Sequence, residues 1–239
     1  MSEHTFAVCA YKESRFLEEC ILSLKNQTVK TDIIVATSTP NDFIKNICKK
    51  YNLPLYINEG EGGITQDWNF AYNKAKGKYI TIAHQDDVYN PRYVEYCLQY
   101  MKKRKKPLLF FTDYQELRNG RKVAVNKLLR IKRLMLLPLR CSLFWNSRFV
   151  RRRILSLGSP ICCPSVTFVR DNVMNPVFLH HFRAAEDWEA WERISRLKGA
   201  FLYCAKPLTY HRIHDESETT AVLAQNLRGQ ENYEMYLKF

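Results

Sequence analysis

The sequence has no long apolar run and lacks the usual marks of a secreted or membrane-spanning chain. The first ten residues, MSEHTFAVCA, contain neither a basic stretch nor a long apolar stretch, so we expect no secretory signal. The most apolar window, 134–145, is interrupted by Pro138 and Arg140 and falls short of the roughly 18 residues that span a bilayer. We therefore expect a cytoplasmic protein without a transmembrane helix.

Cysteine pairs typical of zinc sites are also missing. None of the eight cysteines belongs to a CxxC pair or lies near a histidine at zinc-ligand spacing, and most lie within apolar runs. Such cysteines usually behave as small buried hydrophobic side chains in a reducing compartment. The sequence thus argues against disulfides and against a cysteine-based zinc site.

Acidic residues are nearly missing from residues 102–153, which contain 17 Lys or Arg but only 2 Asp or Glu. This segment has a net charge of +15, whereas the whole chain has +13, so the remainder is close to neutral. Such an asymmetry predicts an anionic partner or surface. No recognisable DNA- or RNA-binding module accompanies the charge, and we expect no nucleic acid partner.

Within this segment, residues 126–158 mix cations with large apolar side chains. A helical stretch of this composition is typical of segments that lie in the interface of an anionic membrane. We therefore expect peripheral association with the inner face of the plasma membrane. Two alternatives remain open: a lid over an acceptor site that packs onto the domain, and a contact between copies of the chain.

Apolar runs that suit buried strands alternate with helix-length segments over the first hundred residues. Such alternation is typical of parallel strands joined by right-handed helical crossovers. The sequence therefore predicts an α/β fold with a Rossmann-like, mostly parallel central sheet, helices on both faces and a basic amphipathic helical insertion. The expected strands are 5–10, 32–37, 53–58 and 78–84.

The second half has a different pattern, without internal repeats or low-complexity linkers. We expect one continuous domain over residues 1–220, followed by a C-terminal helix over 221–239. The expected elements are a hairpin over 107–125 around Asn119-Gly120, helical structure over 127–155, a strand at 163–170, a helix at 185–197 and one or two strands within 200–214.

Two adjacent carboxylates, Asp86 and Asp87, come directly after the fourth predicted strand. In an open parallel sheet, ligands bind outside the carboxyl ends of the strands. The loops 11–13 and 37–39 should reach the same rim. Carboxylates there suit a hard divalent cation that is bound together with phosphate oxygens. The alternative is that one of the two caps a helix that starts near Pro91.

Four segments of the sequence, in this order, resemble the opening, metal-binding, catalytic and closing motifs of glycosyltransferase family 2. This family contains inverting nucleotide-sugar transferases with the GT-A fold. The resemblance covers roughly residues 5–220, and it implies a nucleotide-sugar half over about 1–115 and an acceptor or catalytic half over about 116–220. The four segments are 8–28, 58–91, 185–194 and 210–220.

The resemblance implies a role for each matching residue. Asp187 would be the catalytic base, with Glu186 as a neighbour that positions the acceptor or the base. A divalent cation, Mn²⁺ or Mg²⁺, would be held by Asp86, His84 and His214. The residues implied to bind the donor are Ala10, Tyr11, Glu13, Thr37, Asp67, Asn69, Gln85, Asp87 and Arg212.

Two positions depart from the family pattern. The metal-binding DXD segment usually begins with Asp, whereas His84-Gln85-Asp86 stands here, and imidazole ligates Mn²⁺ but suits Mg²⁺ poorly. Residues 37–39 offer hydroxyl groups where many relatives carry an acidic residue that contacts the nucleobase. The donor nucleotide is therefore not indicated.

The implied function is transfer of a sugar from a nucleoside-diphosphate donor to a glycan or a lipid-diphosphate acceptor in cell-surface polysaccharide synthesis. One alternative is a non-catalytic binding protein on a transferase scaffold, which His84 and residues 37–39 make conceivable. Another is a sugar-nucleotide nucleotidyltransferase. That class needs a glycine-rich, basic loop after the first strand, and CAYKES at 9–14 lacks one.

Overall fold

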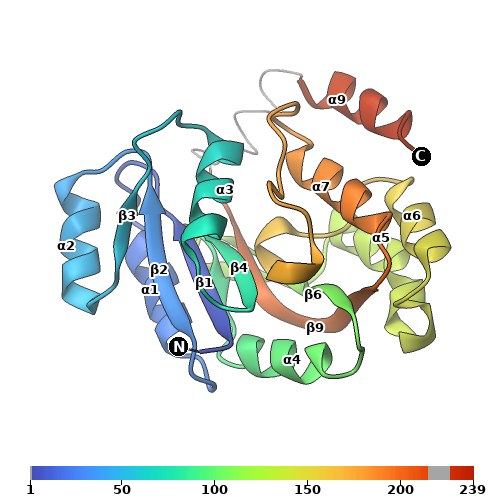
Figure 1. Cartoon of the computed structure of the whole chain (residues 1–239), viewed down its shortest axis with the longest axis horizontal. Helices are drawn as coiled ribbons and strands as arrows, with labels where there is room; N and C mark the ends of the chain where they lie inside the picture. The colour runs from blue at the N-terminus through green and yellow to red at the C-terminus, as the bar shows by residue number, and fades with distance from the viewer. Residues whose placement is uncertain (1, 215–226) are drawn as a thin grey trace.

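The computed structural model describes residues 2–214 and 227–239, and it shows a nine-stranded sheet that runs through both predicted halves (Figure 1). The strands are β1 His4–Cys9, β2 Asp32–Thr37, β3 Leu55–Ile57, β4 Tyr79–His84, β5 Val88–Tyr89, β6 Pro107–Arg118, β7 Arg121–Val123, β8 Val166–Val169 and β9 Ala200–Ile213. The α-helices are α1 Leu17–Lys25, α2 Asp42–Tyr51, α3 Ile64–Lys74, α4 Tyr93–Met101, α5 Lys127–Met135, α6 Arg148–Leu155, α7 Glu186–Ser195 and α9 Leu227–Tyr236.

The sheet has the strand order β3-β2-β1-β4-β8-β6-β9-β5, with β7 paired to β6. The first four strands are parallel, as predicted, and each is within a few residues of its predicted range. Beyond β4 the sheet is mixed, because β8 runs antiparallel to both β4 and β6 while β6 and β9 are parallel. Parallel pairing still accounts for most of the paired residues.

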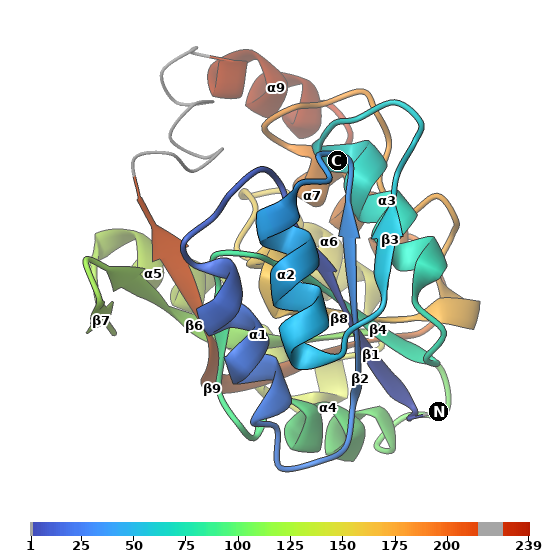
Figure 2. The ribbon, with the colours of Figure 1, turned by 90° about the vertical axis from the view of Figure 1, so that its left-hand side faces the viewer.

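Helices cover both faces of the sheet, as the alternation of side chains along β1 shows. The ring of Phe6 packs against Tyr93 of α4, with 5.8 Å between the centroids. Cys9, three residues further and therefore on the opposite face, reaches the carbonyl oxygen of Asp67 in α3 at 3.9 Å. Figure 2 shows α1 and α2 against the edge of the sheet formed by the first strands.

The predicted hairpin over 107–125 is confirmed, since β6 and β7 pair antiparallel through a turn at Asn119-Gly120. Asn119 and Gly120 have φ angles of 48° and 74°, which this tight turn requires. The two possible strands within 200–214 are a single long strand, β9. Its pairing with β6 shifts register twice around Asp113, so one strand can bend along two differently oriented parts of the sheet.

The basic segment is helical, as predicted, but it is divided. Helices α5 and α6 are separated by two 3₁₀ turns, η1 Leu137–Arg140 and η2 Ser142–Phe144, because Pro138 cannot continue an α-helix interior. Side chains of Asn126 and Ser147 accept hydrogen bonds at the two α-helix starts.

Helix α9 lies within the predicted C-terminal helix 221–239. The predicted boundary at 220 and part of the closing motif, 215–220, lie outside the described residues. Within the described ranges, no helix combines the length and the apolar character needed to cross a bilayer. All eight cysteines are free, as expected.

Candidate active site

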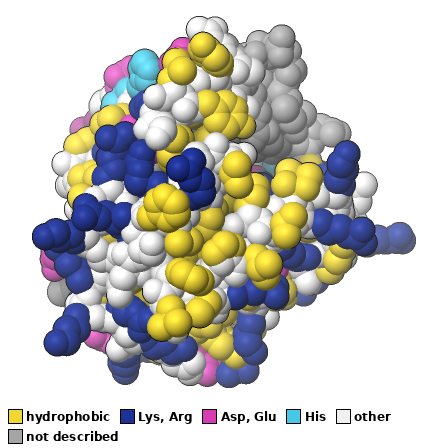
Figure 3. All heavy atoms as spheres, turned by 90° about the vertical axis from the view of Figure 1, so that its right-hand side faces the viewer, with side chains coloured by type: hydrophobic (Ala, Val, Ile, Leu, Met, Phe, Trp, Pro, Cys, Tyr) yellow, Lys and Arg dark blue, Asp and Glu magenta, His cyan; other side chains and the backbone are white. Residues whose placement is uncertain are grey.

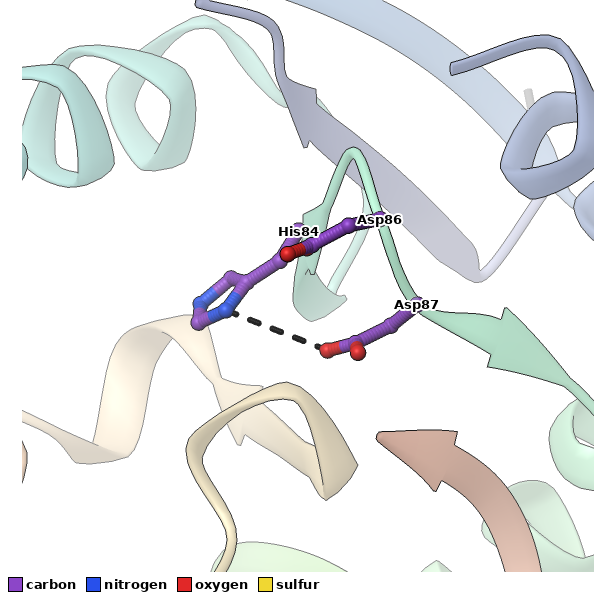
Figure 4. Close-up of side chains that lie close together, drawn as sticks. All are labelled: His84, Asp86 and Asp87. Atoms are coloured by element: carbon purple, nitrogen blue, oxygen red, sulfur yellow. Dashed lines mark ion pairs between the residues drawn. The ribbon is translucent and has the colours of Figure 1, made fainter. Parts of the chain in front are cut away.

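The predicted metal-binding residues gather at the end of β4. His84 is its last residue, and the ligand atoms of His84, Asp86 and Asp87 all lie within 4.8 Å of one another. The His84 Nδ1 and Asp87 Oδ2 atoms are 3.9 Å apart and face each other across the turn toward β5 (Figure 4). The end of β4 and the turn that follows it therefore contain three potential ligands within four consecutive residues.

Two buried side-chain atoms of these residues lack hydrogen bonds to any residue that the structure describes. In the part of the chain that the structure describes, neither His84 Nε2 nor Asp87 Oδ2 has a hydrogen-bond partner. Leaving a polar atom buried and unpaired costs about 1–3 kcal/mol. Such a cost is typical of a site that is completed by a ligand.

The imidazole of His84 is held against the core by Trp68 of α3. The two rings are stacked, with centroids 4.9 Å apart and planes inclined by 18°. Burial lowers the pKa of His84, although the carboxylates of Asp87 and Asp86 act in the opposite direction. The ring is therefore neutral near pH 7, which is the form that ligates a metal. Stacking on Trp68 thus fixes the plane of the His84 ring.

The completely buried Asp87 is held by strand β9. Its Oδ1 accepts hydrogen bonds from the backbone N–H of Arg212 at 2.8 Å and from Nδ1 of His211 at 3.0 Å. Burial alone would raise the pKa of Asp87, but His211 and these hydrogen bonds outweigh it, so the pKa is lowered. The same carboxylate raises the pKa of His211 against the effect of its burial.

The neighbouring Asp86 is held by the end of the same strand. Its Oδ2 lies 3.0 Å from Nε2 of His214, and Nε of Arg212 donates to its backbone carbonyl at 2.7 Å. Neither aspartate caps the following helix, because α4 starts after Arg92 without a side-chain cap. The capping alternative is therefore wrong.

The guanidinium of Arg212 is fixed from several sides. It forms an ion pair of 2.5 Å with Glu19 of α1 and lies 4.2 Å from the ring centroid of Phe16. Only 6% of the residue is exposed. Arg212, predicted to contact the leaving diphosphate, thus connects α1 to the Asp86 turn.

The loops after β1 and β2 reach the same rim, as predicted. The side chain of Gln85 joins β4 to β1, since it accepts from Tyr11 N–H at 2.9 Å and donates to Tyr11 C=O at 3.0 Å. Lys12 has a φ of 52°, and its N–H donates to Oγ1 of Thr39 at 2.6 Å. The buried Thr37 hydroxyl accepts from the Thr39 N–H, so it shapes this loop.

Two more of the predicted donor-binding residues lie on this rim. The buried Ala10 donates its N–H to the carbonyl of Ala36 in β2 at 2.8 Å, and Glu13 is exposed in the loop that follows. Ala10 is therefore placed to contact a ligand only through its backbone, whereas the exposed Glu13 has its carboxylate in solvent.

Two donor-binding predictions fall on α3, and the structure separates them. Asp67 is half-buried and joins the ends of two strands, because Ser38 Oγ and Asn58 Nδ2 donate to its carboxylate at 2.6 and 2.9 Å. Asn69 is buried, and its amide makes hydrogen bonds of 2.8 and 3.1 Å to the backbone of Phe178. Asn69 therefore holds the loop that leads to α7 rather than lining the rim.

The predicted catalytic pair begins helix α7. Glu186 is buried, and the Asp187 Oδ1 atom accepts from the N–H of Trp188 at 2.6 Å. The pKa of Cys162 is raised, first by its burial, and both Asp87 and Asp187 add to that effect. Burial and the two carboxylates thus act in the same direction on this thiol.

Two contributors were missed from the sequence. His211 was not among the predicted site residues, yet its Nδ1 lies 3.0 Å from Oδ1 of Asp87. Glu231 of α9 accepts hydrogen bonds from three successive backbone N–H groups just before α7, with lengths of 2.9, 2.7 and 3.0 Å. The alternation of side chains along β9 could not predict the role of His211. Asp87 accepts hydrogen bonds both from the side chain of His211 and from the backbone N–H of Arg212, so two consecutive residues contact the same carboxylate.

The donor set fits a divalent cation. Two carboxylates and one neutral imidazole suit Mn²⁺ better than Mg²⁺, which prefers oxygen ligands alone. His211 and His214 donate toward the carboxylates from behind, which is the arrangement that orients metal ligands in many sites. Of the predicted ligands, His84 and Asp86 belong to the compact group. His214 contacts Asp86 instead of completing that group, and Asp87 takes its place.

The family profile described as Glycosyl transferase family 2 matches residues 5–177, which is most of the described chain. The chain belongs to glycosyl transferase family 2. The fold is accordingly the GT-A fold that the sequence predicted. Among curated relatives, glycosyltransferase GlyA of Streptococcus pneumoniae is 30% identical over 96 residues, covering 38% of this chain and 14% of its own length. An uncharacterized glycosyltransferase of Rickettsia typhi is 23% identical over 90% of this chain and 65% of its own.

Two solved structures of glycosyl-donor complexes have a similar fold. TarS 1–349 of Staphylococcus aureus, in complex with UDP-GlcNAc, superposes with a TM-score of 0.68 at 18% identity, over 98% of this chain and 64% of that one. The mannosyltransferase PcManGT of Pyrobaculum calidifontis, in complex with GDP-Man and Mn²⁺, gives 0.70 at 12% identity, over 98% and 62%. The chain thus spans less than two thirds of the length of these family members.

Proposed function

We propose that the protein is an inverting glycosyltransferase that uses a nucleoside-diphosphate sugar. The observation that carries this proposal is the compact group of His84, Asp86 and Asp87 at the carboxyl end of β4, whose ligand atoms all lie within 4.8 Å of one another. A diphosphate needs positive charge at the place where it binds and leaves. A divalent cation in this group would supply that charge.

The start of α7 supplies the second requirement, a base. In an inverting displacement, the acceptor hydroxyl oxygen bonds to the anomeric carbon while the bond from that carbon to the diphosphate oxygen breaks. The acceptor proton passes to a carboxylate, for which we propose Asp187, with Glu186 beside it. The N-terminus of α7 favours the ionised form through its partial positive charge, so the carboxylate is ready to accept a proton.

The nucleoside would lie against the loops after β1 and β2. Tyr11 is nearly half exposed there, and the Asp67 carboxylate lies beside Ser38 and Asn58. The donors in the complexes of the two structural neighbours have different nucleobases, since one is UDP-GlcNAc and the other is GDP-Man. Support for the donor class is therefore stronger than support for any one base, and the roles of Ala10, Glu13, Gln85 and Thr37 in donor binding remain predictions.

As the acceptor we propose a glycan or a lipid-linked diphosphate in cell-surface polysaccharide synthesis, with the protein at the inner face of the plasma membrane. The basic segment supports this choice, because diphosphate lipids and anionic bilayers both attract cations. The nucleotidyltransferase alternative has no support from the site. The binding-protein alternative differs from our proposal only in whether transfer occurs.

The decisive experiment combines binding and turnover. UDP- and GDP-sugars are titrated calorimetrically with and without Mn²⁺, and donor turnover is measured with a mixture of candidate acceptors. We expect donor binding to depend on Mn²⁺ in the wild type and to be lost in Asp86→Asn. Asp187→Asn should bind donor like the wild type but transfer sugar 10²–10⁴-fold more slowly, the range that a positioned base contributes.

Asp42→Asn is the matched control, because its carboxylate lies on α2 with 91% exposure and pairs with Lys45 at 3.3 Å. Mn²⁺-dependent donor binding without any transfer or donor hydrolysis would favour the binding protein. Unchanged donor binding in Asp86→Asn would contradict the metal assignment, and full activity in Asp187→Asn would remove it as the base.

A further inference from the structure

The helix α5 turns apolar residues outward and a cation inward. Leu128, Ile131 and Leu134 follow one another at helical spacing, and their exposed fractions are 52%, 46% and 69%. Arg133 points inward instead, where its Nε donates to Asp113 at 2.8 Å and its other nitrogens to backbone carbonyls of the β6–β7 hairpin region. A surface helix normally does the reverse, so this orientation indicates a partner for the apolar side.

The apolar surface continues along the rest of the segment. We define the basic–apolar face as the exposed residues of 126–158, and Figure 3 shows its apolar side chains grouped among Lys and Arg on the side of the molecule that carries α5 and α6. Leu143 and Phe149 are exposed by 81% and 72%. Its other exposed large apolar side chains are Leu137, Phe144 and Leu157. Contiguous exposure of this kind usually marks an interaction site.

Cations surround these apolar side chains without any opposing charge. Residues 126–158 contain nine Lys or Arg and no Asp or Glu. Three of the nine are used internally, because Arg151, Arg133 and Arg152 bind carbonyl or carboxylate groups of the core. The cations left exposed on the face are Lys127, Arg130, Arg140, Arg148 and Arg153.

A cationic hollow of about 570 Å³ adjoins this face. It is lined by Lys103–Lys106, Arg148 and Lys198, together with Asn146 and Gly199. The guanidinium of Arg104 donates to the carbonyl of Ser142 at 2.6 Å, which joins the hollow to η2. A niche of this size and charge is suited to an anionic headgroup.

We propose that the basic–apolar face docks the protein onto an anionic lipid bilayer, with Leu and Phe side chains in the interface and the cations among lipid phosphates. The apolar side chains of the face match the acyl chains of the bilayer, and its cations match the anionic headgroups. A second copy of the chain matches it poorly, because a two-fold interface would place these cations against the same cations of the partner. This docking deepens the membrane location proposed above, and that location rests on it. It does not depend on the transfer chemistry, so donor binding and sugar transfer would persist if the docking failed.

Vesicle co-sedimentation of the full chain tests the proposal. Vesicles of phosphatidylcholine are compared with vesicles that also contain phosphatidylglycerol, at low and at high salt. We expect the wild type to bind the anionic vesicles at low salt and to be released by salt. The triple variant Lys127→Gln, Arg130→Gln, Arg140→Gln should partition about 100-fold less, since each cation near the surface contributes about five-fold.

A second triple variant, Leu134→Ser, Leu143→Ser, Phe149→Ser, separates insertion from charge. It should weaken vesicle binding even at low salt, with donor binding unchanged. Control variants remove exposed groups elsewhere. Lys30→Gln, Lys49→Gln and Lys76→Gln serve for charge, and Leu22→Ser, Ile57→Ser and Leu237→Ser, which are 42%, 42% and 70% exposed, serve for apolar area.

Sedimentation velocity of the same variants gives the competing outcome. No binding of the wild type to anionic vesicles, or equal binding by the face variants and the controls, would overturn the docking proposal. If the apolar triple variant converted a dimer to a monomer and left vesicle binding unchanged, the face would be a contact between copies instead.

Discussion

The carboxylate of Glu231 should determine how firmly the start of α7 is held. It accepts three backbone N–H groups, from Arg183 through Oε1 and from Ala184 and Ala185 through Oε2. In Glu231→Gln one oxygen becomes an NH₂ group, so at least one N–H faces a donor instead of an acceptor. A hydrogen bond to a charged group contributes about 1.5–3 kcal/mol, so we expect a local loss of about 2 kcal/mol.

Native-state hydrogen exchange measures this loss at the three amides themselves. A change of about 2 kcal/mol corresponds to exchange about 30-fold faster in Glu231→Gln than in the wild type. If Asp187 is the base, the same variant should reduce kcat with little effect on donor KM, because the metal-binding turn is untouched.

The matched control lies one turn away on the same helix. Glu234 pairs with His181 at 3.3 Å, but the two side chains are 39% and 64% exposed. Exposed ion pairs of this kind contribute little to stability, so Glu234→Gln should change the free energy of exchange at residues 183–185 by less than about 0.5 kcal/mol. Equal exchange rates at residues 183–185 in both variants would refute the idea that Glu231 positions the start of α7.

Three further predictions concern stability. Burial lowers the pKa of His4 to about 3, so the unfolded state binds more protons between pH 6.5 and 3; urea titrations should show wild-type stability falling by about 1.4 kcal/mol per pH unit below 6.5, relative to His4→Gln. Gly199 has a φ of 142°, and a Cβ there would lie 2.7 Å from Leu108 Cγ, so Gly199→Ala should cost about 3 kcal/mol of unfolding free energy in chemical denaturation. Arg151 donates to the carbonyls of Ser195, the last residue of α7, and of Leu197 and Gly199 after it. Arg151→Met should lower the melting temperature by the equivalent of about 3 kcal/mol, whereas the exposed Arg153→Met should not.

The sequence predicted the first half of the fold well because β1 and β4, and most of β2, are buried on both faces. A short apolar run between two helical segments, such as 33–36 within β2, is most readily explained as a buried strand. The second half was harder to predict, since β8 is only four residues long and its antiparallel insertion between β4 and β6 depends on pairing partners far away in the chain. The two-residue strand β5 gives no periodic signal at all.

The candidate site shows the same division. Which residues end β4 could be read from the sequence, and with them His84 and Asp86 of the cluster, whereas Asp87 was assigned to donor binding and His214 to the metal. The roles of Asn69 and Arg212 could not be read, because their partners, Phe178 and Glu19, are distant in sequence. The contact of Glu231 with residues 183–185 depends on where α9 packs, which no local pattern determines.

The attachment of Asp87 to β9 has a consequence for how the protein can be divided. A fragment ending near residue 115 would keep His84, Asp86 and Asp87 but would lose the strand whose His211 and Arg212 hold the buried carboxylate. Such a fragment would carry a buried aspartate with no donors, so it should not work as an independent nucleotide-binding module. The two halves are therefore separate in sequence motifs but inseparable as functional units.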